Sequence, residues 1–460
     1  MDVHEIEVVG KEFEAYLEEF SDCFGRCDTA SYLGVYVEGQ HSDLQRKSVE
    51  PIALKAEIPP RSLQVFLRTA RWNEERMVDR VQEIVARDHG HPFAIGLVDE
   101  SGSPKKGNHT AGVQRQYCGN TGKIDNCVVS VHIGYTAGSF HSLLDSELFL
   151  PKAWADDPAR RKEAGIPDDV RHRTKPEIAL AQIKRAEDSA ESLGHGIRVS
   201  AWTFDEQYGQ SYAFLDGVDA LGQTYVAEVP CHFHGWAISP KILHRATPQE
   251  RRRKGKKQRV PRLAKTASKT SEVRNLLKHS PAFTQQPWTP IHIKEGEKGP
   301  MVREVKVISF QMQRDGLPTR PHRLMATRNP EQPDAVKFFV SNAPADWPLE
   351  RLVYVAYSRW PIEQCFKEEK DELGFDHFEV RGWQSIHRHM VLTQVSHLYL
   401  NRMRKQLMAQ EHAAKEAGFF SLPRSRRRSP HVSRGKPDPQ PNPRCPGRLV
   451  RRLVVGATCA

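Results

Sequence analysis

Long apolar runs are missing from this chain of 460 residues. No stretch approaches the roughly 18 consecutive apolar residues that a membrane-spanning helix needs, so a membrane protein is not expected. The first residues, MDVHEIEVVG, lack the basic and apolar regions of a secretion signal. Eight cysteines are too few to form a disulfide framework in so long a chain. We therefore expect reduced thiols and a cytoplasmic location.

Two further absences concern the chemistry. The chain has no glycine-rich phosphate loop of the Walker type, so a nucleotide cofactor is not expected. Cysteines and histidines such as Cys23, Cys27, Cys231 and His234 do not follow the spacing of a four-ligand zinc site. The candidate chemistry must therefore come from other residue types.

Positive charge is what the chain has in excess. It carries 68 lysines and arginines against 57 acidic residues, which gives a formal net charge of +11. That balance favours a polyanionic partner such as double-stranded DNA. With 27% charged and 38% apolar residues, the composition is that of a globular protein with a substantial core.

Three acidic residues stand in distinctive local contexts. Asp99 ends the apolar run FAIGLVD, Asp205 ends the run IRVSAWTFD, and Glu363 follows Pro361 in a helix-like stretch. Since proline favours the first turn of a helix, we expect Glu363 in that turn. Carboxylates are the ligands that Mg²⁺ prefers. Two such ions, roughly 3.5–4 Å apart, serve phosphoryl transfer by activating the attacking oxygen and stabilising the leaving oxygen.

The pattern around the first two aspartates predicts an α/β fold with a mixed sheet. Ligand sites in such sheets lie at the carboxyl ends of strands, which is where we expect Asp99 and Asp205. Predicted strands cover residues 93–99, 127–135, 139–151, 197–205 and 223–230, and predicted helices cover residues 175–194 and 208–220.

The chain divides by composition into five segments. As many as 158 positions separate Asp205 from Glu363, more than a compact core needs, and a β-rich insertion accounts for the excess. The predicted segments are a helical N-terminal domain (1–88), the first part of a catalytic core (89–230), a β-rich insertion domain (231–345), the last part of the core with C-terminal helices (346–412), and a basic, proline- and arginine-rich tail that we expect to be disordered (413–460).

Two basic features admit a DNA-binding interpretation. Residues 46–69 read as helix, proline-containing turn and helix, which predicts either a helix-turn-helix with Arg61 and Arg68 facing DNA or a plain helical hairpin. Residues 250–278 hold twelve lysines or arginines against two acids. This basic loop either contacts phosphates or is a solvated surface loop. Its candidate DNA-binding residues are Arg251, Arg252, Arg253, Lys254, Lys256 and Lys257.

Lys105 and Lys106 follow Asp99 in the sequence SGSPKKGNH. They are placed either to meet a DNA phosphate beside the metal ions or to form a solvated turn.

Three blocks of the sequence, residues 98–127, 204–209 and 359–383, resemble DDE transposases of bacterial insertion sequences. The resemblance runs from about residue 40 to about residue 400 and is looser between the blocks. It implies an RNase H-like catalytic core interrupted by the β-rich insertion. It also implies that Asp99, Asp205 and Glu363 are the catalytic residues and the ligands of two Mg²⁺ ions, with Mn²⁺ as the alternative metal.

The third block matches one further element of that family. Arg359 and Lys370 have the spacing of an arginine and a lysine that hold the DNA backbone beside the cut site. The family's tyrosine position, 356, holds alanine, and Tyr357 comes one residue later. In related enzymes an aromatic residue of the insertion stabilises a base flipped from the DNA end. Phe338 and Phe339 are the candidates here, burial in a strand being the alternative.

The resemblance implies an enzyme that binds the terminal inverted repeats of a mobile element. Such an enzyme cleaves double-stranded DNA and joins the ends to target DNA, working as a homodimer that pairs two ends near the bacterial nucleoid. Two alternatives remain open. One is a related RNase H-like nuclease or recombinase with another DNA substrate, and the other is a DNA-binding descendant that has lost catalysis.

Overall fold

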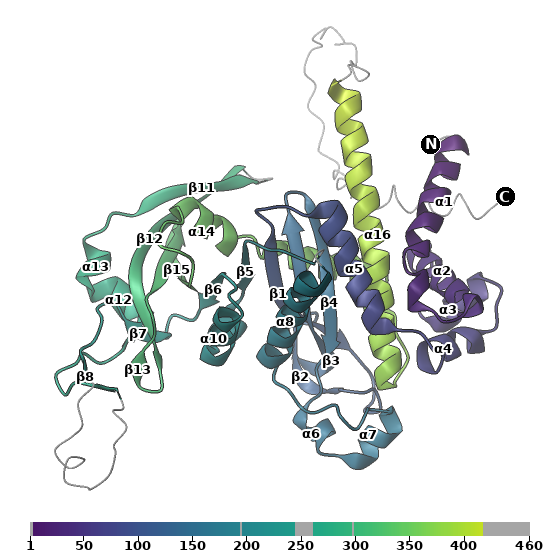
Figure 1. Cartoon of the computed structure of the whole chain (residues 1–460), viewed down its shortest axis with the longest axis horizontal. Coiled ribbons are helices and arrows are strands. Elements are labelled where there is room, and N and C mark those ends of the chain that lie inside the picture. The colour runs from purple at the N-terminus through teal and green to yellow at the C-terminus, as the bar shows by residue number, and fades with distance from the viewer. Residues whose placement is uncertain (1–2, 194–195, 244–260, 297–298, 417–460) are drawn as a thin grey trace, which may run out of the picture. The chain divides into compact units, whose positions relative to one another are not determined.

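The computed structural model describes residues 3–193, 196–243, 261–296 and 299–416 (Figure 1). Two compact units divide these residues. A helical unit takes the described parts of Met1–Val81, Glu163–Ile166 and Cys365–Ala460, and a sheet unit takes those of Gln82–Lys162 and Pro167–Gln364. All six described cysteines are free. No described helix combines the length and apolar character needed to cross a bilayer.

A mixed sheet of thirteen strands forms the frame of the sheet unit. Its main order is β10-β7-β12-β14-β15-β6-β5-β1-β3-β2, while β4 pairs with β3, and β11 and β13 pair with β12. β5 runs parallel to both β1 and β6, and the other pairs are antiparallel. The strands are β1 (Ile95–Pro104), β2 (Gln114–Cys118), β3 (Lys123–Ala137), β4 (Phe140–Leu148), β5 (Ala201–Phe204), β6 (Tyr225–Val229), β7 (His234–Trp236), β10 (Ser271–Glu272), β11 (Thr289–Gly296), β12 (Gly299–Arg314), β13 (Leu317–Pro318), β14 (His322–Asn329) and β15 (Gln332–Ser341).

Helices cover parts of this sheet. The amide of Gln182 on α8 donates to the carbonyl of Val131 on β3 (3.1 Å), which fixes α8 against that strand, and α10 packs on α8. A separate pair of strands is formed by β8 (Ile242–Leu243) and β9 (Arg262–Leu263). The helices of the unit are α6 (Lys152–Ala155), α7 (Pro158–Ala164), α8 (Lys175–Leu193), α9 (Glu206–Gly209), α10 (Tyr212–Ala220), α12 (Val273–His279), α13 (Pro281–Thr284), α14 (Leu349–Ala356) and the first turn of α15 (Trp360–Asp371).

The helical unit is built around the long helix α16. Buried polar pairs join α16 to α2: the Tyr36 hydroxyl lies 2.8 Å from Nδ1 of His389, and the Gln40 amide donates to the Thr393 hydroxyl at 2.8 Å. Trp383, at the start of α16, is 7% exposed and belongs to the core. The elements are α1 (Val3–Glu18), η1 (Ser21–Cys23), α2 (Cys27–His41), α3 (Val49–Lys55), α4 (Pro60–Arg68), the first half of α5 (Glu74–His89), the later turns of α15, η2 (Phe375–His377) and α16 (Trp383–Glu416).

The predicted elements are largely present. Residues 46–69 form the helix pair α3 and α4, with α4 starting at the second of two prolines, and both Arg61 and Arg68 on α4 are exposed. Residues 61–87 do not form one continuous helix, because the chain breaks between α4 and α5. Trp72 and Asn73 cause the break. The Trp72 indole donates back to the carbonyl of Phe66, and the Asn73 side chain accepts from the N–H of Arg76.

The strands expected in residues 231–345 are present, and apart from the separate pair β8 and β9 they extend the same large sheet. β15 pairs with β6 directly, Phe338 lying opposite Val229. Phe338 and Phe339 are 3% and 2% exposed, so both are core residues of the strand. Helix α16 continues to Glu416, into the predicted tail, and the rest of that tail lies outside the described residues.

Candidate active site

Asp99 lies in the middle of β1 rather than at its end, which corrects the expectation from the sequence. β1 pairs with β3 from Ile95 to Pro104, so the strand continues five residues beyond Asp99. Its parallel pairing with β5, however, stops at Val98. Asp99 is therefore the first residue of β1 beyond the end of β5, and Asp205 is the first residue beyond the end of β5 itself.

A close approach of β1 and β5 fixes this register. Gly96 lies opposite Trp202 in the parallel ladder. A Cβ atom at Gly96 would lie 2.3 Å from the indole ring, so only glycine leaves room for Trp202 across β1. Two residues further along, Val98 is paired with Phe204. Asp99 and Asp205 are the next residues of the two chain segments, so they come at the same level of β1 and β5. The apolar packing of these strands thus brings Asp99 and Asp205 to one edge.

Asp205 is the N-cap of the short helix α9. Its side chain accepts hydrogen bonds from the N–H groups of Gln207 (3.0 Å) and Tyr208 (3.4 Å). Gly209 ends this turn against β6, where a Cβ atom would lie 1.8 Å from the carbonyl oxygen of Glu228. The glycine therefore lets α9 sit directly on β6 and holds the Asp205 carboxylate in a fixed orientation.

Arg359 joins the third acidic residue to the first. One guanidinium nitrogen, Nη1, lies 2.5 Å from Oδ2 of Asp99, and Nη2 lies 2.7 Å from Oε1 of Glu363. Glu363 is in the first turn of α15, as predicted, and its side chain is 49% exposed. Because Ile362 of the same turn packs against β3 beside Gly134, α15 presents Glu363 toward the face of the sheet that carries Asp99.

The electrostatics of this cluster are unbalanced. Burial, with a smaller contribution from the nearby Asp205, raises the pKa of Asp99 to about 7 although Arg359 lowers it. Burial also raises the pKa of Asp205, again against the effect of Arg359. Burial lowers the pKa of Arg359, but Asp99, Glu363 and Asp205 together outweigh it, so the net pKa is raised. One guanidinium thus serves three carboxylates, and it does not fully compensate them.

Glu100 supports the site from the neighbouring position on β1, and the sequence analysis missed it. Its carboxylate accepts from Nζ of Lys175 on α8 at 2.6 Å, and from the side-chain amide of Gln207 on α9. Since Lys175 and Glu100 are 19% and 16% exposed, this ion pair is shielded from solvent. It ties β1, α8 and α9 together next to Asp205. The motif DEQ in residues 205–207 carried no signal for this role without the fold.

Tyr208 is the second residue that the sequence analysis missed. Its side chain is fully buried, and its hydroxyl has no hydrogen-bond partner among the described residues. Burial raises the pKa of this hydroxyl, as do the charges of Glu100, Asp99 and Asp205, which places it close to the carboxylates. An unpaired hydroxyl beside buried carboxylates is a group that a bound water or ion can engage.

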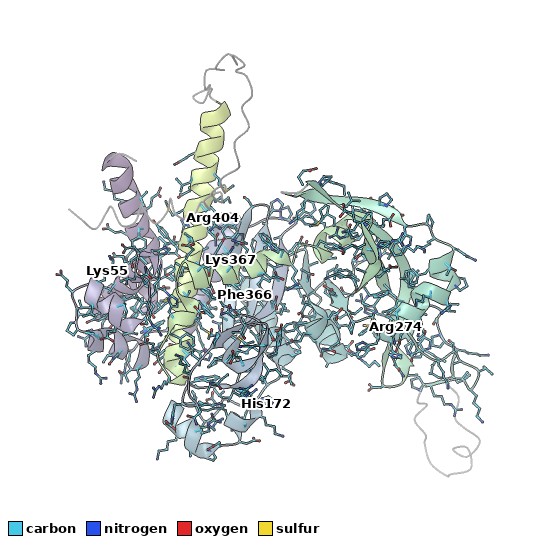
Figure 2. The ribbon with its side chains drawn as sticks, turned by 180° about the vertical axis from the view of Figure 1, so that it is seen from behind. Lys55, His172, Arg274, Phe366, Lys367 and Arg404 are labelled. Atoms are coloured by element: carbon cyan, nitrogen blue, oxygen red, sulfur yellow. The ribbon has the colours of Figure 1, made fainter. Side chains whose placement is uncertain are left out.

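Lys105 and Lys106 are separated from this cluster by the extended strand that follows Asp99. Lys105 and Lys106 lie six and seven residues beyond Asp99, which is roughly 20 Å along an extended strand at about 3.3 Å per residue. Lys370 is in the last turn of α15, three residues beyond the exposed Lys367 that Figure 2 labels. Arg251, Arg252, Arg253, Lys254, Lys256 and Lys257 lie outside the described residues. Their contact with DNA stays a prediction.

Comparison with known proteins identifies the family. Residues 19–300 match the family described as DDE superfamily endonuclease, and this range includes both Asp99 and Asp205. The chain belongs to the DDE endonuclease superfamily. It is also 33% identical over 192 residues to a probable transposase for insertion sequence element IS701 from Microchaete diplosiphon. That match covers 41% of this chain and 46% of the relative, so the chain spans about half the length of its curated relative.

Members of the DDE endonuclease superfamily generally use divalent metal ions, and the residues present in this chain fit such an ion. The candidate ligands are carboxylate oxygens, which suit Mg²⁺ or Mn²⁺ rather than a soft metal. Burial disfavours the charged forms of Asp99 and Asp205 despite Arg359, which a bound cation would reverse, and the Tyr208 hydroxyl has no hydrogen-bond partner within the described part of the chain. Asp99, Asp205 and Glu363 are the residues that would hold the metal. Glu363 lies beyond the residues that match the family, so its assignment to the candidate metal site rests on its hydrogen bond with Arg359.

Proposed function

We propose that this chain is a DDE transposase of the cut-and-paste class. It would bind the terminal inverted repeats of an insertion sequence and catalyse Mg²⁺-dependent cleavage and strand transfer of double-stranded DNA. In this proposal Asp99, Asp205 and Glu363 are the catalytic residues. The protein would act as a homodimer that pairs two element ends.

The observation that carries the proposal is the convergence of three acidic residues from distant parts of the chain. Arg359, which bonds Asp99 across a sequence separation of 260 residues, also bonds Glu363, and Asp205 influences the pKa of both Asp99 and Arg359. The strand order β4-β3-β1-β5-β6, antiparallel up to β1 and parallel from β1 to β6, supports an RNase H-like core. In this view, the strands between β6 and α14 are the β-rich insertion.

Each residue has a defined task in this proposal. Bound divalent ions would supply activation of the attacking oxygen and charge stabilisation of the leaving oxygen. Asp99 and Asp205 would hold those ions from the sheet, and Glu363 would hold them from α15. The hydrogen bonds from Gln207 and Tyr208 orient Asp205, while Glu100 ties α8 to β1 through Lys175 and α9 to β1 through Gln207. Arg359 and Lys370 bind the DNA backbone, Arg61 and Arg68 on α4 bind the element end, and the basic loop adds phosphate contacts.

A cleavage assay tests the proposal. A labelled duplex carrying the element's own end is incubated with Mg²⁺ and either wild-type protein or Asp205→Asn. We expect cleavage at the end by wild type only, with end binding by the variant unchanged within about threefold, since one metal ligand contributes little to phosphate contacts. Loss of binding together with cleavage would contradict the role of Asp205 as a metal ligand.

The same assay separates the rival functions. Equal cleavage of a duplex without the element end indicates a nuclease or recombinase with another substrate. Tight end binding with no cleavage by wild type indicates a DNA-binding descendant without catalysis. Inverted repeats that bracket the gene would favour the transposase over both.

A further inference from the structure

Arg359 occupies the centre of the candidate active site. Its two terminal nitrogens each donate to a different carboxylate, Asp99 at 2.5 Å and Glu363 at 2.7 Å. The side chain is 26% exposed, so this guanidinium is largely shielded from solvent. A planar, permanently charged fork that donates to two carboxylates is the arrangement that gives strong and directional hydrogen bonds.

The carboxylates of Asp99 and Glu363 are arranged around the Arg359 guanidinium. Among the residues that the structure describes, Asp99, Asp205 and Glu363 do not form a set whose ligand atoms all lie within 4.8 Å of one another. Instead, Asp99 and Glu363 lie on two sides of Arg359. Glu100 is not available as a further partner of Arg359, because it forms an ion pair with Lys175 and accepts a hydrogen bond from Gln207.

We propose that Arg359 is a resident cation of this site, which divalent metal ions must displace before the site can act. This inference rests on the proposed metal-dependent function. An oxygen that accepts a short hydrogen bond from the guanidinium has that lone pair turned away from a metal ion. When ions take Asp99 and Glu363, the guanidinium is released from both and becomes available to a DNA phosphate.

The displacement couples metal binding to DNA binding. A phosphate that draws Arg359 away from Asp99 and Glu363 removes the competitor of the metal, so DNA strengthens metal binding. By linkage, the metal strengthens the contact of Arg359 with DNA by the same factor. Without metal, Arg359 stays bound to Asp99 and Glu363, and the protein has a low affinity for DNA. Without DNA, Arg359 competes with the metal ions, so full metal occupancy depends on the presence of DNA.

Direct Mn²⁺ binding to the full chain tests the displacement without any measurement of cleavage. Free Mn²⁺ is titrated by electron paramagnetic resonance with wild type, Arg359→Met and Arg359→Lys. Arg328→Met is the matched control, since Arg328 pairs with Glu304 at 2.7 Å and is equally shielded, at 25% exposure. The lysine variant retains the charge but has one nitrogen, which cannot serve both carboxylates as the guanidinium fork does.

We expect Arg359→Met to bind Mn²⁺ about tenfold more tightly than wild type, which corresponds to about 1.4 kcal/mol. Arg359→Lys should fall between the two, and Arg328→Met should bind as wild type does. Equal or weaker binding by both Arg359 variants would overturn the displacement. Absence of Mn²⁺ binding in wild type and in both Arg359 variants would instead overturn the proposed metal-dependent function, so the two failures are distinguishable.

A chemical probe of Arg359 in the wild-type chain gives an independent result. Phenylglyoxal modifies accessible guanidinium groups, and peptide mass analysis gives the modified fraction at each arginine. With saturating Ca²⁺ as a non-catalytic ion, we expect modification of Arg359 to rise severalfold while Arg328 stays unchanged. Unchanged or reduced modification of Arg359 at saturating ion would contradict its displacement.

Discussion

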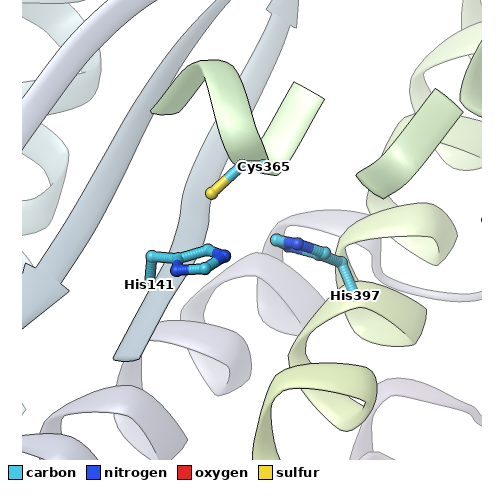
Figure 3. Close-up of side chains that lie close together, drawn as sticks. All are labelled: His141, Cys365 and His397. Carbon is cyan, nitrogen blue, oxygen red and sulfur yellow. The ribbon is translucent and has the colours of Figure 1, made fainter. Parts of the chain in front are cut away.

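The two ends of helix α15 place the same residue type in opposite settings. At its start, Glu363 is 49% exposed and shares one guanidinium with Asp99. Five residues later, Glu368 is 4% exposed and fully paired, with His397 at 3.0 Å and Arg404 at 2.7 Å. Arg404 lies on α16, as Figure 2 shows. His397 also lies on α16, close to Cys365 of α15 (Figure 3).

The difference separates a structural acid from a functional one. Each oxygen of Glu368 has its own partner, so this carboxylate is committed to holding α15 against α16. Among the described residues, Glu363 has Arg359 as its hydrogen-bond partner and must share it with Asp99, and solvent reaches Glu363. A carboxylate that is exposed, incompletely paired and next to buried acids is able to take a cation, whereas a saturated one is not.

Replacing one glutamate at each end of α15 should give the largest contrast. Glu363→Gln should lower the cleavage rate by about 10³-fold or more, because a lost metal ligand removes several kcal/mol of transition-state stabilisation. Glu369→Gln, on a buried later turn, should leave the rate within about threefold of wild type. Single-turnover cleavage of a labelled element end measures both. Equal loss in the two variants would show that α15 matters for its fold rather than for its first turn.

For the free energy of unfolding, the larger effect should come from replacing Glu368 and the smaller from replacing Glu363. Glu368→Ala should lower the free energy of unfolding of the helical unit by about 3 kcal/mol, because it leaves Arg404 and His397 without their buried partner. Glu363→Ala should change stability by about 1 kcal/mol at most, as exposed pairs usually do. Thermal unfolding of the two variants decides this. A larger loss for Glu363→Ala would contradict the division between structural and functional acids.

The pH dependence of stability distinguishes the two ends again. Glu369 is fully buried and neither of its carboxylate oxygens has a hydrogen-bond partner among the described residues, so burial raises its pKa well above the ordinary 4.5. A raised pKa means that the folded state holds a proton that the unfolded state has released. The stabilisation is therefore complete below about pH 4.5 and is lost as the pH rises toward the folded-state pKa.

Glu369→Gln mimics the protonated form and should remove this loss. Between about pH 5 and pH 8, wild type should lose more stability than the variant, as measured by thermal unfolding at each pH. Parallel pH profiles for the two proteins would mean that Glu369 is ionised in the folded state.

The smallest effect is expected at Tyr208. Tyr208→Phe removes a buried hydroxyl that has no partner in the described part of the chain, so the metal-free protein should gain up to about 1 kcal/mol of stability. The extra thermal stabilisation by Mn²⁺ should shrink, because the hydroxyl can no longer engage a bound water. A variant that loses stability without metal would show that the hydroxyl is satisfied after all.

The sequence predicted which strands and helices carry the site better than it predicted how they are arranged. The apolar runs before Asp99 and Asp205 identified β1 and β5, and Pro361 located Glu363 in the first turn of α15. The end of β1 was misplaced, since polar residues after Asp99 continue the strand by pairing with β3. Periodicity does not record which strands pair, so it could not show where β5 stops beside β1.

Contacts between distant residues were beyond the sequence for the same reason. The bridge from Arg359 to Asp99 spans 260 residues, and the pairing of Glu100 with Lys175 spans 75. Lys105 and Lys106, which follow Asp99 closely in the sequence, are carried away from it by the extended strand. The family motif gave Arg359 and Glu363 as neighbours in sequence, but only the fold brought Asp99 to the same guanidinium.

Anomalous diffraction from crystals of the protein soaked in Mn²⁺ is the most direct test of the account. It predicts anomalous peaks in coordination distance of Asp99, Asp205 and Glu363, with the Arg359 guanidinium turned away from Asp99 and Glu363. Peaks absent from this cluster at saturating Mn²⁺, with Arg359 still bridging the two carboxylates, would contradict both the metal site and its control by Arg359.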